Sequence, residues 1–230
     1  MIQYLEWDSN FFEKRVGSLL LEDANQFSYN ELNQFDLVYI IANEGIEYNF
    51  LIDNSSFLLV DNKITYSKKL IAEPPYDSNV ATFLKEDVIT KQLQNIAIQS
   101  GVYSRFNIDP NISEDQFHQL YSIWLTNSVS RKIAKEVLVY KKESDIAGLI
   151  TLGIKNNKAD IGIIAVEEKY RGNKIGTKLL EAAGFWAQQN FNLEEIQVVT
   201  QQANLQACLF YERNGFLISK KQEIYHWWKK

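Results

Sequence analysis

The chain has 230 residues, a net charge of −5 and a sequence pI near 5.2, so a broad basic surface for nucleic acid or anionic membranes is not expected. Hydrophobic residues make up 46% of the sequence and aromatic residues 13%. This is the composition of a globular protein with a sizeable core, not of a disordered or fibrous one.

The N-terminus and the single cysteine indicate the compartment. The first residues, MIQYLEWDSNFF, lack the basic segment, apolar run and cleavage site of a secretory signal. No stretch approaches the roughly 18 apolar residues of a membrane helix. Cys208 cannot form an internal disulfide, and we expect it to be a small buried hydrophobic residue and not a nucleophile. A cytoplasmic location is therefore expected.

The first seventy or so residues contain one short helix signal. Ser28 is followed three residues later by Glu31, as in a capping box, and Phe27 and Leu32 have the spacing of a hydrophobic staple. A helix is therefore predicted to begin at Tyr29.

Two strands and a break follow. Residues 36–43 and 55–70 are rich in β-branched and aromatic residues and predict strands. Residues 73–78, EPPYDS, interrupt the pattern because Pro-Pro fixes the backbone and excludes a helix before it. We predict a smaller N-terminal α/β domain at residues 1–75 and a second domain at residues 76–230.

The second domain begins with two predicted helices, residues 90–101 and 112–129. In the second helix, Ser113 and Gln116 form a capping-box pattern, and the apolar residues that follow share one face. The pattern of the remaining chain predicts an antiparallel meander, then a helix, a strand, a helix and a final strand, at residues 136–142, 146–155, 159–166, 176–189, 194–201, 204–214 and 219–228.

A predicted anion site lies where the third meander strand enters the next helix, in ADIGIIAVEEKYRGNKIGTKLL. Backbone N–H groups at a helix start lack internal partners, and the helix dipole adds positive potential, so the turn can bind a pyrophosphate. Gly172 and Gly176 permit close approach, and Arg171 and Lys174 add charge. The alternative is a simple connection between a strand and a helix.

The downstream segment TQQANLQACLFYERNGF makes the site more specific. A helix from Asn204 places Tyr211 on the same face two turns later, and Gly215 suits its end. Together the two segments resemble the acetyl-CoA motifs of the GNAT superfamily, [RQ]-x-x-G-x-[GA] and N-x-x-A-x-x-x-Y-x-x-x-G-F. The second motif matches fully. In the first, Lys174 replaces the middle glycine, which would be strained if that position requires positive φ.

The rest of the chain resembles the dTDP-fucosamine acetyltransferase family, in the pieces EWDSNFF, LLVDNKI, Ser104-Arg105-Phe106 and Leu120-Tyr121 with Trp124 and Asn127. The resemblance implies an α/β fold: a GNAT domain with a mixed central sheet flanked by helices, preceded by a smaller α/β domain that completes the acceptor pocket. It also implies transfer of acetyl, or of a longer group such as 3-hydroxybutyryl, to the amine of a dTDP-linked amino-6-deoxy sugar. The product would serve a cell-surface glycan such as lipopolysaccharide.

The resemblance also implies site residues. Tyr211 would protonate the departing thiolate, and Asp61 would act through water as the base that accepts the amine proton. A backbone N–H near Val166 would polarise the thioester oxygen. The residues expected to bind the acyl-CoA co-substrate are Ile164, Ala165, Val166, Arg171, Gly172, Asn173, Lys174, Ile175, Gly176, Thr177, Asn204 and Ala207. Those expected to bind the acceptor are Phe11, Phe12, Arg105, Phe106, Tyr121 and Trp124.

Each assignment has an alternative. Asp61 could be a turn aspartate, Arg105 could pair with an acidic side chain, and Tyr211 and the acceptor-site aromatics could simply pack in the core. The acceptor could instead be a protein N-terminus, a lysine or a polyamine, or the chain could be a catalytically silent CoA-binding module. His118 and His226 have no partner at metal-ligand spacing, so no metal is expected. The aromatic tail at residues 225–228 fits either a homodimer surface or a core strand.

Overall fold

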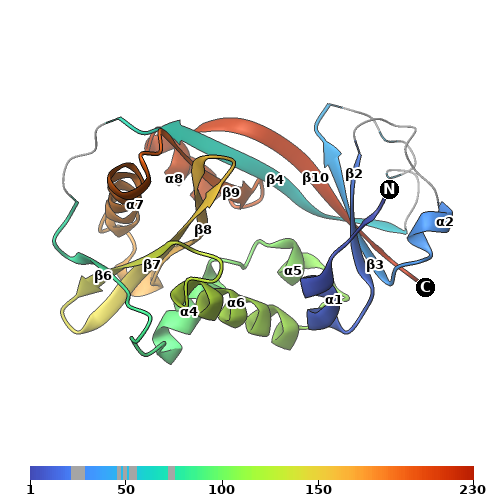
Figure 1. Cartoon of the computed structure of the whole chain (residues 1–230), viewed down its shortest axis with the longest axis horizontal. Coiled ribbons are helices and arrows are strands. Elements are labelled where there is room, and N and C mark those ends of the chain that lie inside the picture. Colours follow the sequence, from blue (N-terminus) through green and yellow to red (C-terminus); the bar gives the residue numbers. More distant parts are fainter. Residues whose placement is uncertain (22–28, 46–47, 49–50, 52–55, 72–75) are drawn as a thin grey trace.

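The fold is described from a computed structural model, for residues 1–21, 29–45, 48, 51, 56–71 and 76–230. These residues form a ten-stranded sheet with helices on both faces (Figure 1). The strands are β1 (Gln3–Tyr4), β2 (Val16–Leu21), β3 (Leu37–Asn43), β4 (Phe57–Lys69), β5 (Val80–Thr82), β6 (Glu136–Lys142), β7 (Asp145–Lys155), β8 (Lys158–Val166), β9 (Glu195–Gln201) and β10 (Leu217–Trp228). The helices are α1 (Glu6–Phe12), α2 (Tyr29–Leu32), α4 (Lys91–Gln99), α5 (Arg105–Ile108), α6 (Glu114–Val129), the 3-10 turn η1 (Glu168–Tyr170), α7 (Ile175–Phe191) and α8 (Leu205–Arg213). None of these helices combines the length and the apolar character that crossing a membrane would require.

The sheet is mixed. Its strand order is β1-β2-β3-β10-β4-β9-β8-β7-β6-β5. The pairs β2–β3 and β8–β9 are parallel, and the other neighbours are antiparallel. The predicted mixed sheet flanked by helices and the predicted meander of β6, β7 and β8 are therefore confirmed.

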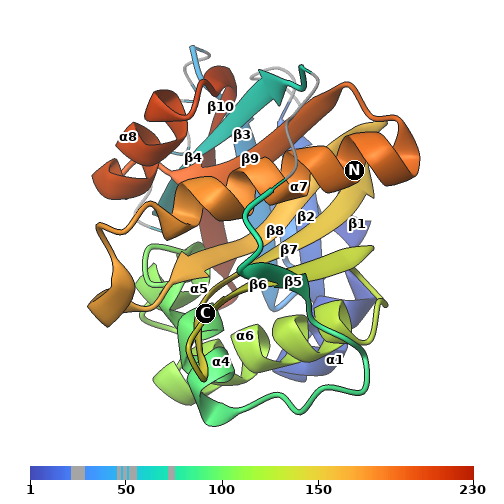
Figure 2. The same ribbon diagram turned by 90° about the vertical axis from the view of Figure 1, so that its left-hand side faces the viewer.

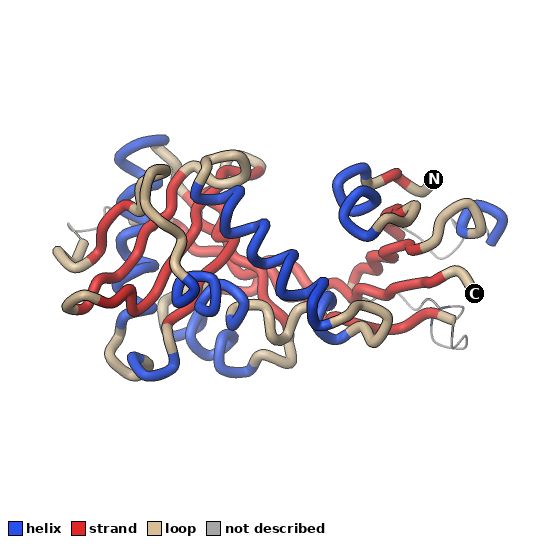
Figure 3. The backbone as a smooth tube through the Cα atoms, turned by 90° about the horizontal axis from the view of Figure 1, so that it is seen from below, coloured by secondary structure: helices blue, strands red, loops and turns tan. Residues whose placement is uncertain are grey.

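The C-terminal strand β10 completes the N-terminal half of the sheet. It pairs with β3 on one side and with β4 on the other. Figure 3 shows the strands passing between the two halves of the molecule, with both termini at one end. The aromatic tail lies in this strand, and Tyr225, His226 and Trp227 are at most 7% exposed, so the core-strand interpretation of the tail is confirmed.

The sheet also crosses the expected domain boundary. β4 precedes residue 75, yet it pairs with β9 and β10 of the second half. The division at residues 1–75 and 76–230 stays a prediction. Residues 73–75 of the proline segment lie outside the described residues, as do Phe27 and Ser28 of the first helix signal; α2 begins at the predicted Tyr29.

The two faces of the sheet carry separate cores. α7 and α8 cover one face, and α1, α4 and α6 cover the other (Figure 2). Side chains alternate between these faces along each strand. In β10, for example, Tyr225 and Trp227 pack with Val38 of β3, whereas Trp228 packs with the group that contains Leu37 and α6 residues. The distinction matters because the predicted site residues come from both faces.

Helix α6 forms as its sequence predicts. Ser113 Oγ accepts a hydrogen bond from the Gln116 N–H (3.2 Å), and Gln116 Oε1 accepts one from the Ser113 N–H (3.0 Å). Leu120 and Leu125 are fully buried, and burial of each stabilises the fold by about 1.5–3 kcal/mol. The capping box and the apolar face are therefore confirmed.

Helix α1 was not predicted: the sequence of the N-terminal half signals one helix, α2, and the structure contains α1 as well. Its Asp, Ser and Asn residues are weak helix formers, and its N-cap makes no side-chain hydrogen bond. Tertiary contacts hold it instead. Ser9 Oγ donates to the Leu5 carbonyl (2.6 Å), and the buried Phe12 ring packs against Phe106 of α5 (centroids 6.4 Å apart). Such long-range support leaves no local sequence signal.

Candidate active site

The turn before α7 presents free backbone donors. The N-cap residue Lys174 makes no side-chain cap, and the first helical bond runs from the Lys178 N–H to the Lys174 carbonyl (3.1 Å). The N–H groups of the first helical turn, residues 175–177, are therefore available to an anion, and the dipole of the 17-residue helix adds positive potential. Gly172 has φ +82° and open space around it. The turn can therefore hold a pyrophosphate.

Lys174 does adopt a positive φ, the case in which its replacement of glycine would be strained. Its φ is 58° and its ψ is 14°, which is the left-handed region. For a residue with a Cβ, this conformation costs about 1–2 kcal/mol. Gly172 and Lys174, on either side of Asn173, both have positive φ, and turns with residues in the left-handed region can form anion-binding concavities.

The start of α7 also contacts α8. A Cβ on Gly176 would lie 3.0 Å from the Phe210 ring, so glycine lets α8 approach the turn. Because Phe210 directly precedes Tyr211, this contact places the predicted acid near the anion turn. Arg171 directs its Nε–H at the Val166 carbonyl (3.2 Å), and Asn173 donates to the Tyr170 carbonyl (2.9 Å), so both side chains shape the turn.

Strands β8 and β9 part in the middle of the sheet. They pair at only three positions, from Ala159 to Ile161, although β8 continues to Val166 and β9 to Gln201. Beyond Ile161 the backbone of β8 on this side pairs with no strand among the residues that the structure describes. The half-buried residues 164–166 therefore border an opening where an extended ligand can bond to backbone groups.

A β-bulge bends β8 at this opening. Pairing with β7 shifts between Ile150 and Leu152, so β8 carries an extra residue there. Thr151 Oγ1 accepts the hydrogen bond of the Ile163 N–H (2.9 Å), and a Cβ on Gly162 would lie 2.9 Å from that same oxygen. Bulges bend the strand that carries them, which accounts for the parting. The bulge is not among the features predicted from the sequence, although an isolated glycine in a strand pattern, here Gly162, is a signal for one.

Helix α8 begins shortly after β9 and places Tyr211 against β4. Asn204 caps the helix by accepting from the Ala207 N–H (3.1 Å), and Gly215 ends it with φ +81°. Tyr211 is buried next to Phe216 and, from β4, Tyr66, each with ring centroids 5.7 Å away. Burial raises the pKa of Tyr211 well above its usual value, so the hydroxyl keeps its proton.

Asp61 is held inside β4 and is 8% exposed, so its interpretation as a turn aspartate is wrong. Burial raises the pKa of Asp61 to about 6, against the opposing effects of Arg105 and of a hydrogen bond from Gln201. Within the described residues, its Oδ1 has no hydrogen-bond partner. A carboxylate that titrates near neutrality and keeps a free lone pair suits a general base.

Asp61 and Tyr211 lie on opposite faces of the sheet. Asp61 interacts with Arg105 of α5, whereas Tyr211 belongs to the core cluster under α7. Gln201, the last residue of β9, lies beside Asp61 and lowers its pKa. The Gln201 carbonyl accepts a hydrogen bond from the Asn204 N–H (2.9 Å) at the start of α8. Sequence reasoning did not identify Gln201.

The predicted acceptor-site residues gather on the Asp61 face. The aromatic ones form one chain of ring contacts: Phe11 to Phe12, Phe12 to Phe106, Phe106 to Trp124, and Trp124 to Tyr121. Phe12, Phe106 and Tyr121 are buried in the core. Arg105 is half-buried above the Tyr39 and Phe106 rings (4.6 and 4.5 Å), and it makes no ion pair within the part of the chain that the structure describes.

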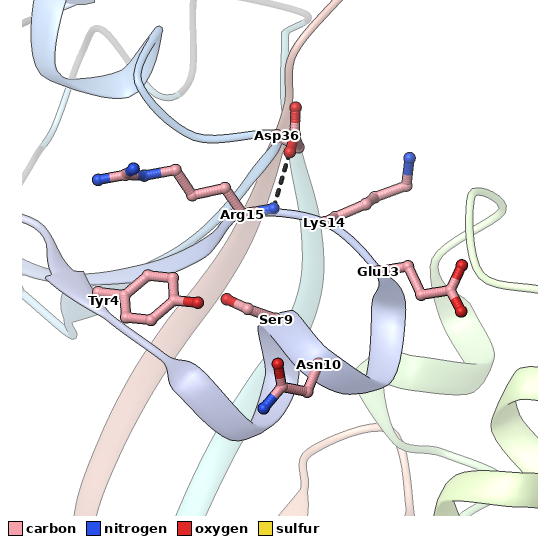
Figure 4. Close-up of a pocket in the computed structure, with 7 residues that line it drawn as sticks. All are labelled: Tyr4, Ser9, Asn10, Glu13, Lys14, Arg15 and Asp36. Carbon is pink, nitrogen blue, oxygen red and sulfur yellow. Dashed lines mark hydrogen bonds between the residues drawn. The ribbon is translucent and has the colours of Figure 1, made fainter.

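A separate surface pocket lies beside α1. Figure 4 shows the polar residues that line it, Tyr4, Ser9, Asn10, Glu13, Lys14, Arg15 and Asp36. The Arg15 N–H donates to Asp36 (2.7 Å) across it. None of the predicted site residues lines this pocket. Among the described residues, no group of three or more His, Cys, Asp or Glu side chains could hold a metal.

An uncapped helix turn, two parted strands and a buried tyrosine beside them define an acyl-CoA-dependent acyltransferase. A model of the Acetyltransferase (GNAT) family matches residues 102–216, half of the chain. The chain therefore belongs to the GNAT acetyltransferase family, whose members use acetyl-CoA as acyl donor.

Two curated relatives and one solved structure illustrate the similarity. The chain is 22% identical to the spore coat polysaccharide biosynthesis protein SpsD of Bacillus subtilis, over 96% of this chain and 81% of SpsD. It is 30% identical to streptothricin acetyltransferase A of Bacillus subtilis, over 53% of this chain and 69% of that protein. A conserved protein of unknown function from Staphylococcus epidermidis shares the fold, with a TM-score of 0.62 and 14% identity over 94% of this chain and 84% of that one.

Proposed function

We propose that the enzyme transfers an acyl group, acetyl or a longer one such as 3-hydroxybutyryl, from acyl-CoA to the amine of a dTDP-linked amino-6-deoxy sugar. The similarity to SpsD supports a sugar acceptor, because that protein's name refers to polysaccharide biosynthesis and the match includes the N-terminal half. The product would enter the synthesis of a cell-surface glycan.

The observation that carries this proposal is the placement of Asp61 and Tyr211 on opposite faces of strand β4. The anion turn of α7 and the acid Tyr211 belong to one face, which would receive the coenzyme. The base Asp61 and the half-buried Arg105 belong to the other, which would receive the acceptor. The two substrates would meet where β8 and β9 part.

The chain's own residues account for each proton. The amine nitrogen attacks the thioester carbon, forming a C–N bond, and Asp61 accepts the amine proton directly or through water. As the C–S bond breaks, Tyr211 donates its proton to the departing sulfur. Backbone N–H groups of the unpaired part of β8 stabilise the oxyanion, and this positioning and electrostatic contribution outweighs the roughly 10²–10⁴-fold of acid–base assistance.

Arg105 supports an anionic acceptor. Its guanidinium stacks on two aromatic rings without an ion pair among the described residues, on the face that Asp61 shares. An arginine of this kind can bind a diphosphate in bidentate fashion. The dTDP group supplies such a diphosphate, whereas a polyamine or a lysine does not.

A thiol-release screen tests the proposal. Acetyl-CoA and longer acyl-CoAs are crossed with dTDP-3-amino and dTDP-4-amino sugars, peptides and polyamines, and free CoA thiol is measured. We expect the highest kcat/KM with one dTDP-amino sugar. Preference for peptides or polyamines would reject the sugar acceptor, and no thiol release with any amine would indicate a silent CoA-binding module.

A further inference from the structure

Four buried polar atoms without hydrogen-bond partners lie together on the acceptor face. In the part of the chain that the structure describes, they are Asp61 Oδ1, Ser104 Oγ, Arg105 Nε and His226 Nε2. More than nine in ten buried polar groups are normally paired, so their occurrence around the start of α5 indicates a functional site. Asp61 and Arg105 already belong to the proposed acceptor site, whereas His226 has no assigned role.

His226 is held by Asp109, the residue that ends α5. Its Nδ1 lies 2.6 Å from Asp109 Oδ2, which also accepts from Trp228 Nε1–H (2.8 Å). Asp109 Oδ1 accepts from the backbone N–H and the side-chain amide of Asn111, both at 2.9 Å. Both oxygens of the Asp109 carboxylate therefore accept hydrogen bonds.

The bonding pattern fixes the protonation state of the pair. Burial alone would raise the pKa of Asp109, but the hydrogen bonds from His226, Asn111 and Trp228 hold it below its usual value. Burial lowers the pKa of His226 to about 4, and the positive charge of Arg105 acts in the same direction. The neutral ring must then place its proton on Nδ1, toward Asp109, so Nε2 keeps a lone pair.

That lone pair and Arg105 Nε are complementary neighbours. The His226 ring lies 4.8 Å from the Tyr39 ring and 6.5 Å from the Phe106 ring, and the guanidinium of Arg105 stacks on the same two rings. Arg105 Nε–H is a buried donor and His226 Nε2 a buried acceptor. Arg105 is half-buried as a residue although its Nε is covered, so its exposed surface belongs to its other atoms.

We infer that His226 is a positioning residue for Arg105: its Nε2 accepts the Arg105 Nε–H when the outer guanidinium nitrogens bind an anionic group of the acceptor. The ionised Asp109 behind the ring polarises it without adding a second cation beside Arg105. This inference deepens the proposed function and rests on it, because it assigns the fixed orientation of Arg105 to the recognition of a diphosphate.

Two variants that each remove one hydrogen bond to Asp109 test the positioning role of His226. His226→Phe keeps an aromatic ring beside Tyr39 and removes one hydrogen bond to Asp109 Oδ2, and Trp228→Phe removes the other bond to the same oxygen. We expect His226→Phe to raise the KM for the dTDP-amino sugar about tenfold or more, as expected for loss of a hydrogen bond to a charged group. For His226→Phe, less than threefold change is expected in three other constants: the kcat, the KM for acyl-CoA, and the KM for the same amino sugar without its nucleotide. For Trp228→Phe, every constant should change less than threefold.

A binding measurement separates this inference from the proposed reaction. Calorimetry with dTDP, in saturating CoA so that the α7 turn is filled, should show the same tenfold loss for His226→Phe, and no further loss when this change is added to Arg105→Lys. If no amino sugar is acylated but dTDP binding follows this pattern, the inference stands and the proposed acceptor fails. Equal losses in His226→Phe and Trp228→Phe, or additive losses in the double variant, overturn the inference.

Asp109→Asn keeps the test decisive if His226→Phe does not fold. The carboxamide can donate to Nδ1, which moves the imidazole proton to Nε2 and turns it toward another donor. Affinity for dTDP should therefore fall about tenfold while the acyl-CoA KM is retained. Unchanged dTDP affinity in a folded Asp109→Asn variant refutes the role of the Nε2 lone pair.

Discussion

Replacing Asp61 with asparagine should stabilise the fold at neutral pH and inactivate the enzyme. Burial raises the pKa of Asp61 from 3.8 to about 6, so the folded protein holds this proton more tightly than the unfolded chain. Asp61 therefore contributes stability at pH values below about 4 that is lost as the pH rises through about 6. At about 1.4 kcal/mol per pH unit, the ionised carboxylate costs the wild type about 3 kcal/mol at neutral pH, a cost that Asp61→Asn avoids.

Urea unfolding at pH values from 4 to 8 measures this cost. The difference in unfolding free energy between Asp61→Asn and the wild type should grow by about 2.4 kcal/mol between pH 4 and pH 7 and then stay nearly constant. Asp115→Asn, on the exposed face of α6, is the matched control for loss of a surface carboxylate. The kcat of Asp61→Asn should fall by roughly 10²–10⁴-fold. A stability difference that does not vary with pH would refute the reasoning, because Asp61 would then lack the environment that makes it a base.

Three further variants test the donor side and the fold. Tyr211→Phe should lower kcat by roughly 10²-fold or more with little change in CoA affinity, and an unchanged kcat in a thiol-release assay removes Tyr211 from the mechanism. Lys174→Gly should stabilise the protein by about 1 kcal/mol in thermal unfolding because it relieves a positive φ, whereas Lys174→Ala should not; equal effects would mean that the backbone is unstrained. Ser113→Ala should cost about 1 kcal/mol of stability without altering kinetics, and a changed KM would place the α6 cap in the site.

Local patterns predicted most elements because their signals act over a few residues. The capping box at Ser113 and the alternation in β6 to β8 are of this kind, and both are present. The placement of β10 between β3 and β4 depends on pairing across more than 150 residues, which periodicity does not encode. Helix α1 was missed for the same reason, since contacts with α5 and β2 support it.

The site was predictable to the extent that its motifs are contiguous. The α7 turn and the α8 helix followed from two segments, whereas the sequence left open whether Lys174 adopts a positive φ. The bulge at Gly162 and the Asp109–His226 pair join residues that are distant in sequence. His226 was assessed for metal spacing only, and its actual partner is 117 residues away.

Strand β4 explains how the acid and the base keep a fixed relation across the sheet. Tyr66 and Asp61 are an odd number of residues apart on a stretch of β4 without a bulge, so they face opposite sides. Tyr66 donates to Glu212 of α8 (2.9 Å) and packs against Tyr211, so it positions the acid from one side. Asp61 projects from the same strand toward Arg105 on the other side. Because β4 pairs with β10 from Phe57 to Ser67 and with β9 from Lys63 to Lys69, the sheet holds the two proposed catalytic groups in a fixed relation.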